Sequence, residues 1–101
     1  IKSDLNFAMK KTSIFKIRKK LDIIDIKLLK IIKKRSLLVD KILKLKKNKK
    51  EVIDQKRINF ILKRIRQYSK KVKIDPDITL NIWKVMIKSF ISYEYKKFKK
   101  K

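Results

Sequence analysis

Apolar residues recur every seven positions between residues 14 and 46, and polar residues fill most of the places between them. This period predicts one amphipathic helix from Ser13, a candidate N-cap, to about Lys47. Such a helix is about 50 Å long, which is more than so short a chain can cover by itself. We therefore expect a second copy of the chain to pack on it. The repeat has two columns, namely Ile14, Leu21, Leu28 and Ile42, and then Ile17, Ile24, Ile31, Leu38 and Leu45.

Arg35 interrupts the first column, because it stands where the repeat places an apolar residue between Leu28 and Ile42. A guanidinium group keeps its charge, so burying it among apolar side chains is costly unless an anion meets it. Arg35 is therefore a candidate anion-binding residue.

The segments on either side of this helix lack the repeat. Residues 1–12 are predicted to form a flexible leader, and residues 46–50 form a charged break. Asp54 is placed to cap a second helix that runs to about Lys71.

A third helix is predicted from the Asp-Pro-Asp sequence at residues 75–77, which is typical of a cap followed by the first helical turn. It runs to about Phe98, and residues 99–101 form a basic tail. The sequence thus predicts an all-α fold of three helices, in one domain at residues 13–98.

The composition excludes several classes of chemistry. The chain lacks Gly, Cys and His and has 44% hydrophobic residues, which favours helices over sheets. Without Cys or His there is no disulfide, no thiolate or histidine metal site and no Ser-His catalysis. The longest apolar runs have three residues, as at 37–39, so we expect neither a membrane-spanning helix nor a signal peptide. We expect a cytoplasmic protein without metal, cofactor or membrane partner.

The formal net charge of +24 has two interpretations. One is nucleic-acid binding, with Tyr93, Tyr95 and Phe98 as a stacking surface. The other is the bias of an A- and T-rich genome, in which lysine simply fills solvated faces. We favour the second, because charge alone supports only a weak inference about partners. A nucleic-acid binder also gives no reason for Arg35 in the apolar column, so we expect no nucleic-acid partner.

A third column, one residue past the second, carries Arg18 and Lys46. Helix geometry places Lys46 about 16 Å along the axis from Arg35 and on nearly the same side, so both cations can reach a small anion between them. Arg18 is about 25 Å from Arg35 and can join such a site only across an antiparallel helix pair. The alternative is that Arg18 and Lys46 are ordinary flanking residues with solvated charges.

Glu94 is the only acid on an apolar stripe of the third predicted helix. Desolvation there favours a protonated carboxyl group that donates a hydrogen bond. The simpler alternative is a buried pair between Glu94 and a lysine or arginine. At the start of the second helix, Asp54 is a cap in either case, and Arg57 can point at an anion. The stripe consists of Leu80, Trp83, Ile87, Phe90, Ile91, Glu94 and Phe98.

These residues resemble the all-helical, or type II, chorismate mutase family. The start of the long helix is similar to that family's opening motif of Leu-Arg, then Ile-Asp and a second Asp. The second helix matches an Asp-Pro-Glu-Arg segment in part, and the resemblance covers about residues 13–98. The matching positions are 17–25, Leu28-Leu29, Arg35, Leu38-Val39, Lys46, Asp54, Arg57, 75–77 and 82–87.

The resemblance implies an intertwined antiparallel homodimer with two active sites. Each site would bind chorismate, a small dianion, and rearrange it to prephenate without a cofactor, which is an isomerase reaction of aromatic amino-acid biosynthesis. Arg35 would bind a carboxylate of the substrate, and Lys46 and Glu94 would meet the breaking ether oxygen. The implied site residues are Arg18 from the partner chain, Arg35, Lys46, Asp54, Arg57 and Glu94.

Two positions depart from the family pattern. Ile58 stands where the family usually has Glu, and Phe90 stands where a small polar residue is common. An apolar residue at the first position resembles the related isochorismate-pyruvate lyases. The choice between chorismate and isochorismate therefore stays open, as does a relic that has kept the fold and lost the activity.

Overall fold

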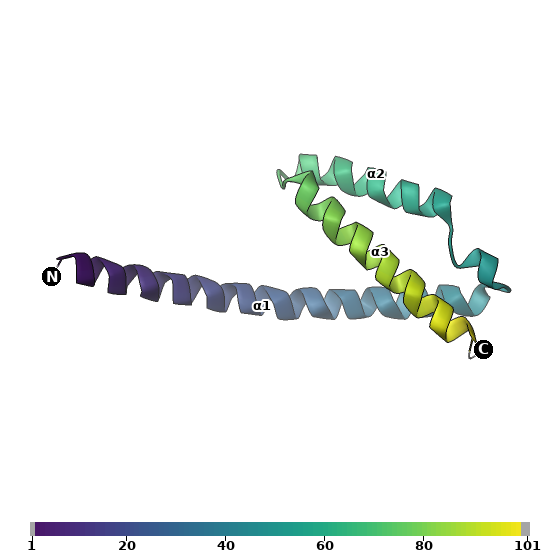
Figure 1. Ribbon diagram of the computed structural model, residues 1–101, viewed down its shortest axis with the longest axis horizontal. Helices are drawn as coiled ribbons and strands as arrows, with labels where there is room; N and C mark the ends of the chain where they lie inside the picture. The colour runs from purple at the N-terminus through teal and green to yellow at the C-terminus, as the bar shows by residue number, and fades with distance from the viewer. Residues whose placement is uncertain (1, 100–101) are drawn as a thin grey trace. The chain divides into compact units, whose positions relative to one another are not determined.

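The computed structural model describes residues 2–99 as three α-helices and one short 3-10 helix (Figure 1). No strand occurs among these residues, so the all-α prediction is confirmed. The chain divides into two compact units, residues 1–37 and residues 38–101. The elements are α1 (Lys2–Leu45), η1 (Lys49–Glu51), α2 (Gln55–Lys71) and α3 (Pro76–Lys99).

Helix α1 begins at Lys2, so the predicted start at Ser13 is wrong. The apolar repeat indicates which residues can be buried. A segment without the repeat can still be helical when it contains no Gly or Pro to break the helix. Residues 2–12 contain neither breaker, and Asp4 lies in the first turn, where a negative charge stabilises the helix dipole.

In the first unit the two apolar columns of α1 face solvent. Ile24 is 55% exposed and Leu28 is 52% exposed. Among the described side chains of the first unit, only Arg35 and Ser36 are half-buried, and the others are exposed. The expectation that another helix covers this apolar surface stays a prediction.

In the second unit, local hydrogen bonds set the ends of α2 and α3. The Asp54 carboxylate accepts from the Arg57 backbone N–H at 3.0 Å, so the predicted cap of α2 is confirmed. The Asp75 carboxylate likewise accepts from the Asp77 N–H at 2.9 Å at the start of α3. Pro76 is the first residue of α3, where its missing N–H costs nothing.

A tight turn joins α2 to α3. The Ile74 N–H donates to the Ser69 carbonyl oxygen at 2.9 Å, and the Lys73 N–H donates to the Lys70 carbonyl at 3.3 Å. This pair of hydrogen bonds is the Schellman motif, in which the penultimate residue has a left-handed backbone conformation and is usually glycine. Because the chain has no glycine, Lys73 takes that conformation, with φ 63°.

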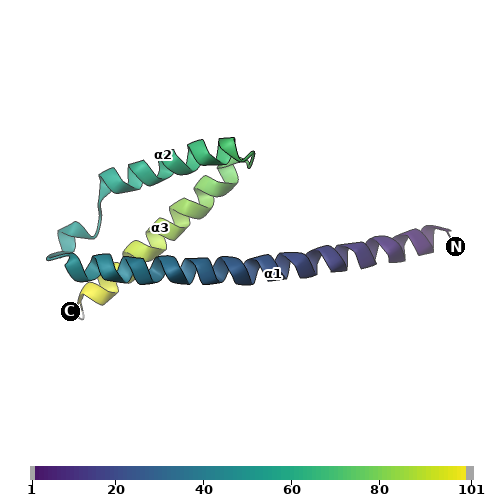
Figure 2. The ribbon, with the colours of Figure 1, turned by 180° about the vertical axis from the view of Figure 1, so that it is seen from behind.

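A small core holds the second unit together. The buried apolar residues come from the end of α1, the segment after η1, and α3. Beside them, the hydroxyl groups of Ser69 and Thr79 share a buried hydrogen bond at 2.7 Å, which ties α2 to α3 near their turn. Figure 2 shows α2 and α3 leaving this turn as two arms. The buried apolar residues are Leu43, Val52, Leu80 and Ile87.

Candidate functional site

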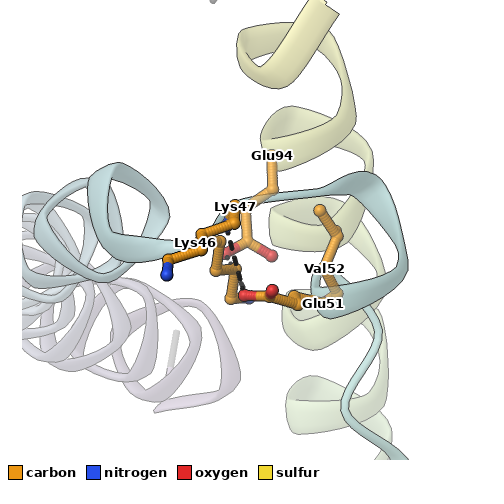
Figure 3. A network of polar contacts seen from close by, with 5 residues as sticks. All are labelled: Lys46, Lys47, Glu51, Val52 and Glu94. Atoms are coloured by element: carbon orange, nitrogen blue, oxygen red, sulfur yellow. Dashed lines mark hydrogen bonds and ion pairs between the residues drawn. The ribbon is translucent and has the colours of Figure 1, made fainter.

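Lys46 and Glu94 meet where α1 ends and α3 passes (Figure 3). The Lys46 Nζ donates to Glu94 Oε1 at 3.4 Å, and the two side chains are only 16% and 9% exposed. Both residues were predicted to belong to the site, and the sequence offered a buried Glu–Lys pair as one alternative for Glu94. The structure contains that pair.

The main chain also holds the Lys46 ammonium group. Its Nζ donates to the Val52 carbonyl oxygen at 3.4 Å, and Val52 is itself buried, with 3% exposure. Glu51 closes the same segment, because its carboxylate accepts from the Lys47 backbone N–H at 3.2 Å (Figure 3). The segment after α1 therefore folds back so that one of its carbonyl groups faces the lysine.

A second polar contact joins α3 to the end of α1 itself. The Tyr93 hydroxyl donates to Asp40 Oδ1 at 2.8 Å, and both residues are half-buried. The sequence did not predict this contact and suggested only that Tyr93 belongs to an aromatic surface. One available signal was charge, because acids are rare here: the chain has only nine Asp and Glu against 33 Lys and Arg.

Four further residues were predicted to belong to the site. In the first unit Arg18 is exposed and Arg35 is half-buried. In the second unit Asp54 is the exposed cap of α2, and the Arg57 guanidinium lies over the Phe60 ring at 5.2 Å. Their roles toward a ligand stay predictions.

An open groove of about 370 Å³ lies between α2 and α3. Ile58, the residue that departs from the family pattern, forms part of its mostly apolar wall. Ile91 and Tyr95 of α3 contribute to the opposite wall. The lining as a whole is Ile58, Leu62, Lys84, Ile87, Lys88, Ile91, Ser92 and Tyr95.

A second concavity, of about 590 Å³, opens beside the Lys46–Glu94 pair. Lys44, Lys46 and Lys47 line it together with the half-buried ring of Phe98. A cavity lined by lysines attracts anions, because like charges gathered at a concave surface reinforce one another's field.

Membrane-spanning helices and metal-binding clusters are both absent from the described residues. Within residues 2–99, no helix is both long and apolar enough to cross a membrane. The same residues contain no group of three or more His, Cys, Asp or Glu side chains that could hold a metal ion.

The part-buried Lys46 ammonium group, held by a carbonyl and a carboxyl group, is a preorganised donor, because its direction is set before any ligand arrives. The profile of a protein family described as chorismate mutase type II matches residues 17–95 of this chain. The match includes both members of the Lys46–Glu94 pair and both arginines of α1. Comparison with curated proteins and with solved structures gave no match.

Proposed function

Because this chain belongs to the type II chorismate mutase family, we propose that it converts chorismate to prephenate. The observation that carries the proposal is the Lys46–Glu94 pair. The sequence marks its two members independently, one as a cation beside the heptad columns and the other as an acid on an apolar stripe. The fold places Lys46 Nζ 3.4 Å from Glu94 Oε1. The family match spans 79 residues, from 17 to 95, so it covers every residue to which a role is given below.

The proposed enzyme is an intertwined antiparallel homodimer. The two apolar columns of α1 support this, because Ile24 and Leu28 expose more than half of their surface in one chain. Covering an isoleucine or leucine side chain stabilises an assembly by about 1.5–3 kcal/mol. In such a dimer Arg18 of one chain serves the site of the other, and Arg35 binds a substrate carboxylate in its own site.

The reaction is a unimolecular rearrangement, so the protein has to supply neither a nucleophile nor an oxidant. It has to hold a flexible dianion in its compact conformer and to stabilise the charge that grows on the ether oxygen. Arg18 and Arg35 do the first, as counter-charges to the two carboxylates. Lys46 does the second, since the Val52 carbonyl holds its ammonium group in a poorly solvated place.

Glu94 serves as the second donor to the ether oxygen. In the structure its carboxyl group accepts from Lys46, so a ligand oxygen that enters between them replaces that contact. A protonated Glu94 then donates to the ether oxygen, whereas an ionised Glu94 repels it. Loss of one such donor raises a barrier by about 3–4 kcal/mol, on the order of a hundredfold or more in rate.

Asp54 and Arg57 complete the proposed site from the start of α2. The family assigns this segment to the ring hydroxyl and its surroundings. Asp54 is already engaged as the cap, so its role is to hold the first turn. Arg57 then offers its guanidinium from that turn.

A second candidate is isochorismate-pyruvate lyase, which Ile58 favours. Ile58 is half-buried and lies in the apolar wall of the groove between α2 and α3. A glutamate at this position offers an oxygen to the substrate hydroxyl, and an isoleucine cannot. The two activities share a fold and differ in substrate and products.

The test is an absorbance assay of chorismate and, separately, of isochorismate, with identification of the products. Prephenate from chorismate is the expected result, while salicylate with pyruvate from isochorismate points to the lyase. Lys46→Met should lower turnover about a hundredfold or more. Lys41→Met, which removes an exposed lysine near the end of α1, is the matched control and should keep the activity. If the chain consumes neither substrate, the proposal is wrong.

A further inference from the structure

Helix α3 contacts the end of α1 through two polar pairs. The Tyr93 hydroxyl donates to Asp40 at 2.8 Å, and Lys46 donates to Glu94 at 3.4 Å. Both pairs lie in the second unit, and both are shielded from solvent to a large extent. The family roles given above use only the second pair.

The two pairs flank a buried apolar residue on the α1 side. Leu43 comes three residues after Asp40 and three before Lys46, and it is 6% exposed. An apolar contact alone has no preferred direction, so a helix packed on Leu43 could roll or slide. A polar contact on either side of it removes that freedom.

On the α3 side the two groups are adjacent in sequence. Successive residues of an α-helix are about 100° apart around its axis, so Tyr93 and Glu94 leave α3 in different directions. A roll of α3 that shortens one contact therefore lengthens the other. The Tyr93–Asp40 bond is the shorter, and a hydroxyl donor to a carboxylate is among the stronger hydrogen bonds.

We propose that Tyr93 and Asp40 are positioning residues, whose hydrogen bond fixes the rotation of α3 on the end of α1 and so holds Glu94 at Lys46. This inference rests on the proposed function, because the reaction gives the position of Glu94 its importance. A donor displaced by about 1 Å from the reacting atoms can cost on the order of a hundredfold in rate. The contact acts through Glu94 and touches no substrate.

The first test is steady-state kinetics of Tyr93→Phe, which removes only the hydroxyl group. We expect kcat to fall about tenfold while KM changes less than about twofold, because alignment matters most in the transition state. Asp40→Asn keeps an oxygen acceptor and should retain most of the activity. Asp40→Leu removes the acceptor and should match Tyr93→Phe.

Tyr68→Phe is the matched control, since it removes the hydroxyl group of an exposed tyrosine on α2. It should leave kcat and KM unchanged. If Tyr93→Phe lowers thermal stability but the folded protein keeps its kcat, the hydrogen bond is merely structural and the proposal is overturned.

A second measurement needs no turnover. Tyr93→Phe, Lys46→Met and the double variant are unfolded in denaturant and compared with the unchanged chain in a double-mutant cycle. If the Tyr93–Asp40 pair positions the Lys46–Glu94 pair, the change in the unfolding equilibrium constant for the double variant should differ by about threefold or more from the product of the two single changes. Independent effects overturn the positioning role. A chain that shows this coupling but consumes neither substrate contradicts the proposed function and leaves the positioning role standing.

Discussion

The two units of this chain treat their apolar residues in opposite ways. In the first unit, Ile24 and Leu28 stand in the heptad columns and are 55% and 52% exposed. In the second unit, Leu43 and Leu80 are each 6% exposed, and the buried polar groups have partners within the same unit. The second unit supplies its own core, while the first carries an apolar surface with the period of a helix–helix interface.

This difference separates two tasks that one chain has to perform. The second unit can align Lys46 and Glu94 from its own contacts. The first unit carries Arg18 and Arg35, and we propose that their use depends on a second chain. Four substitutions test this division of tasks, and we expect the first to have the greatest effect.

Arg35→Leu should abolish turnover while the protein stays folded and dimeric. The change completes the first apolar column, so the dimer should be as stable as before or more stable. The loss of the substrate carboxylate contact should cost on the order of a hundredfold or more in rate. Activity assays beside sedimentation equilibrium check both parts. A dimer that falls apart would show that Arg35 supports the structure.

Ile24→Lys should dissociate the proposed dimer, because each assembly would bury two added charges in its interface. Ile23→Lys is the matched control, since Ile23 is adjacent, equally apolar and 58% exposed but lies outside both columns. Sedimentation equilibrium and the turnover rate should change for Ile24→Lys alone. Equal effects of the two changes would contradict the heptad interpretation of the first unit.

Glu94→Leu should lower turnover about a hundredfold or more, because it removes the proposed donor to the ether oxygen. Glu94→Gln should keep most of the activity, because the glutamine amide group can donate to the same oxygen. Steady-state kinetics of the two variants measure the contrast, and equal losses would show that no donor acts at this position.

Thr79→Val should lower the free energy of unfolding by about 1–3 kcal/mol, because it breaks the buried bond with Ser69 inside the second unit. Thr12→Val removes an exposed hydroxyl group that bonds the Ala8 carbonyl in the first unit. That change should stay within about 0.5 kcal/mol. Denaturant titrations of both variants measure the contrast, and similar losses would argue against two distinct units.

Local signals predicted much of the fold. The cap at Asp54 and the Asp-Pro-Asp start of α3 depend on neighbouring residues, and the structure contains both. The apolar repeat identified the long helix, yet it placed the start of that helix at Ser13. An apolar repeat marks a surface that can pack, and it gives no information about helical residues that lack such a surface. The left-handed Lys73 carried no signal either, since glycine usually marks such a position.

The sequence singled out Lys46 and Glu94 but gave little sign of the contacts around them. Glu94 was visible as the only acid on an apolar stripe, and Lys46 was selected because helix geometry places it on nearly the same side as Arg35. The Tyr93–Asp40 bond joins residues 53 apart in the sequence. The rarity of acids draws attention to Asp40, but only the fold reveals Tyr93 as its partner. The same holds for the Val52 carbonyl, because every residue has one.

The hydrogen bond from Lys46 to the Val52 carbonyl oxygen limits how the sequence of this protein can vary. Since the contact is made by a peptide oxygen, exchanging the valine for another aliphatic residue leaves the acceptor in place. Adding or deleting one residue between Asn48 and Val52 instead moves that oxygen away from the ammonium group. The length of the segment from Asn48 to Val52 is thus constrained far more than the identity of its residues. Natural variants should tolerate substitutions there but seldom insertions.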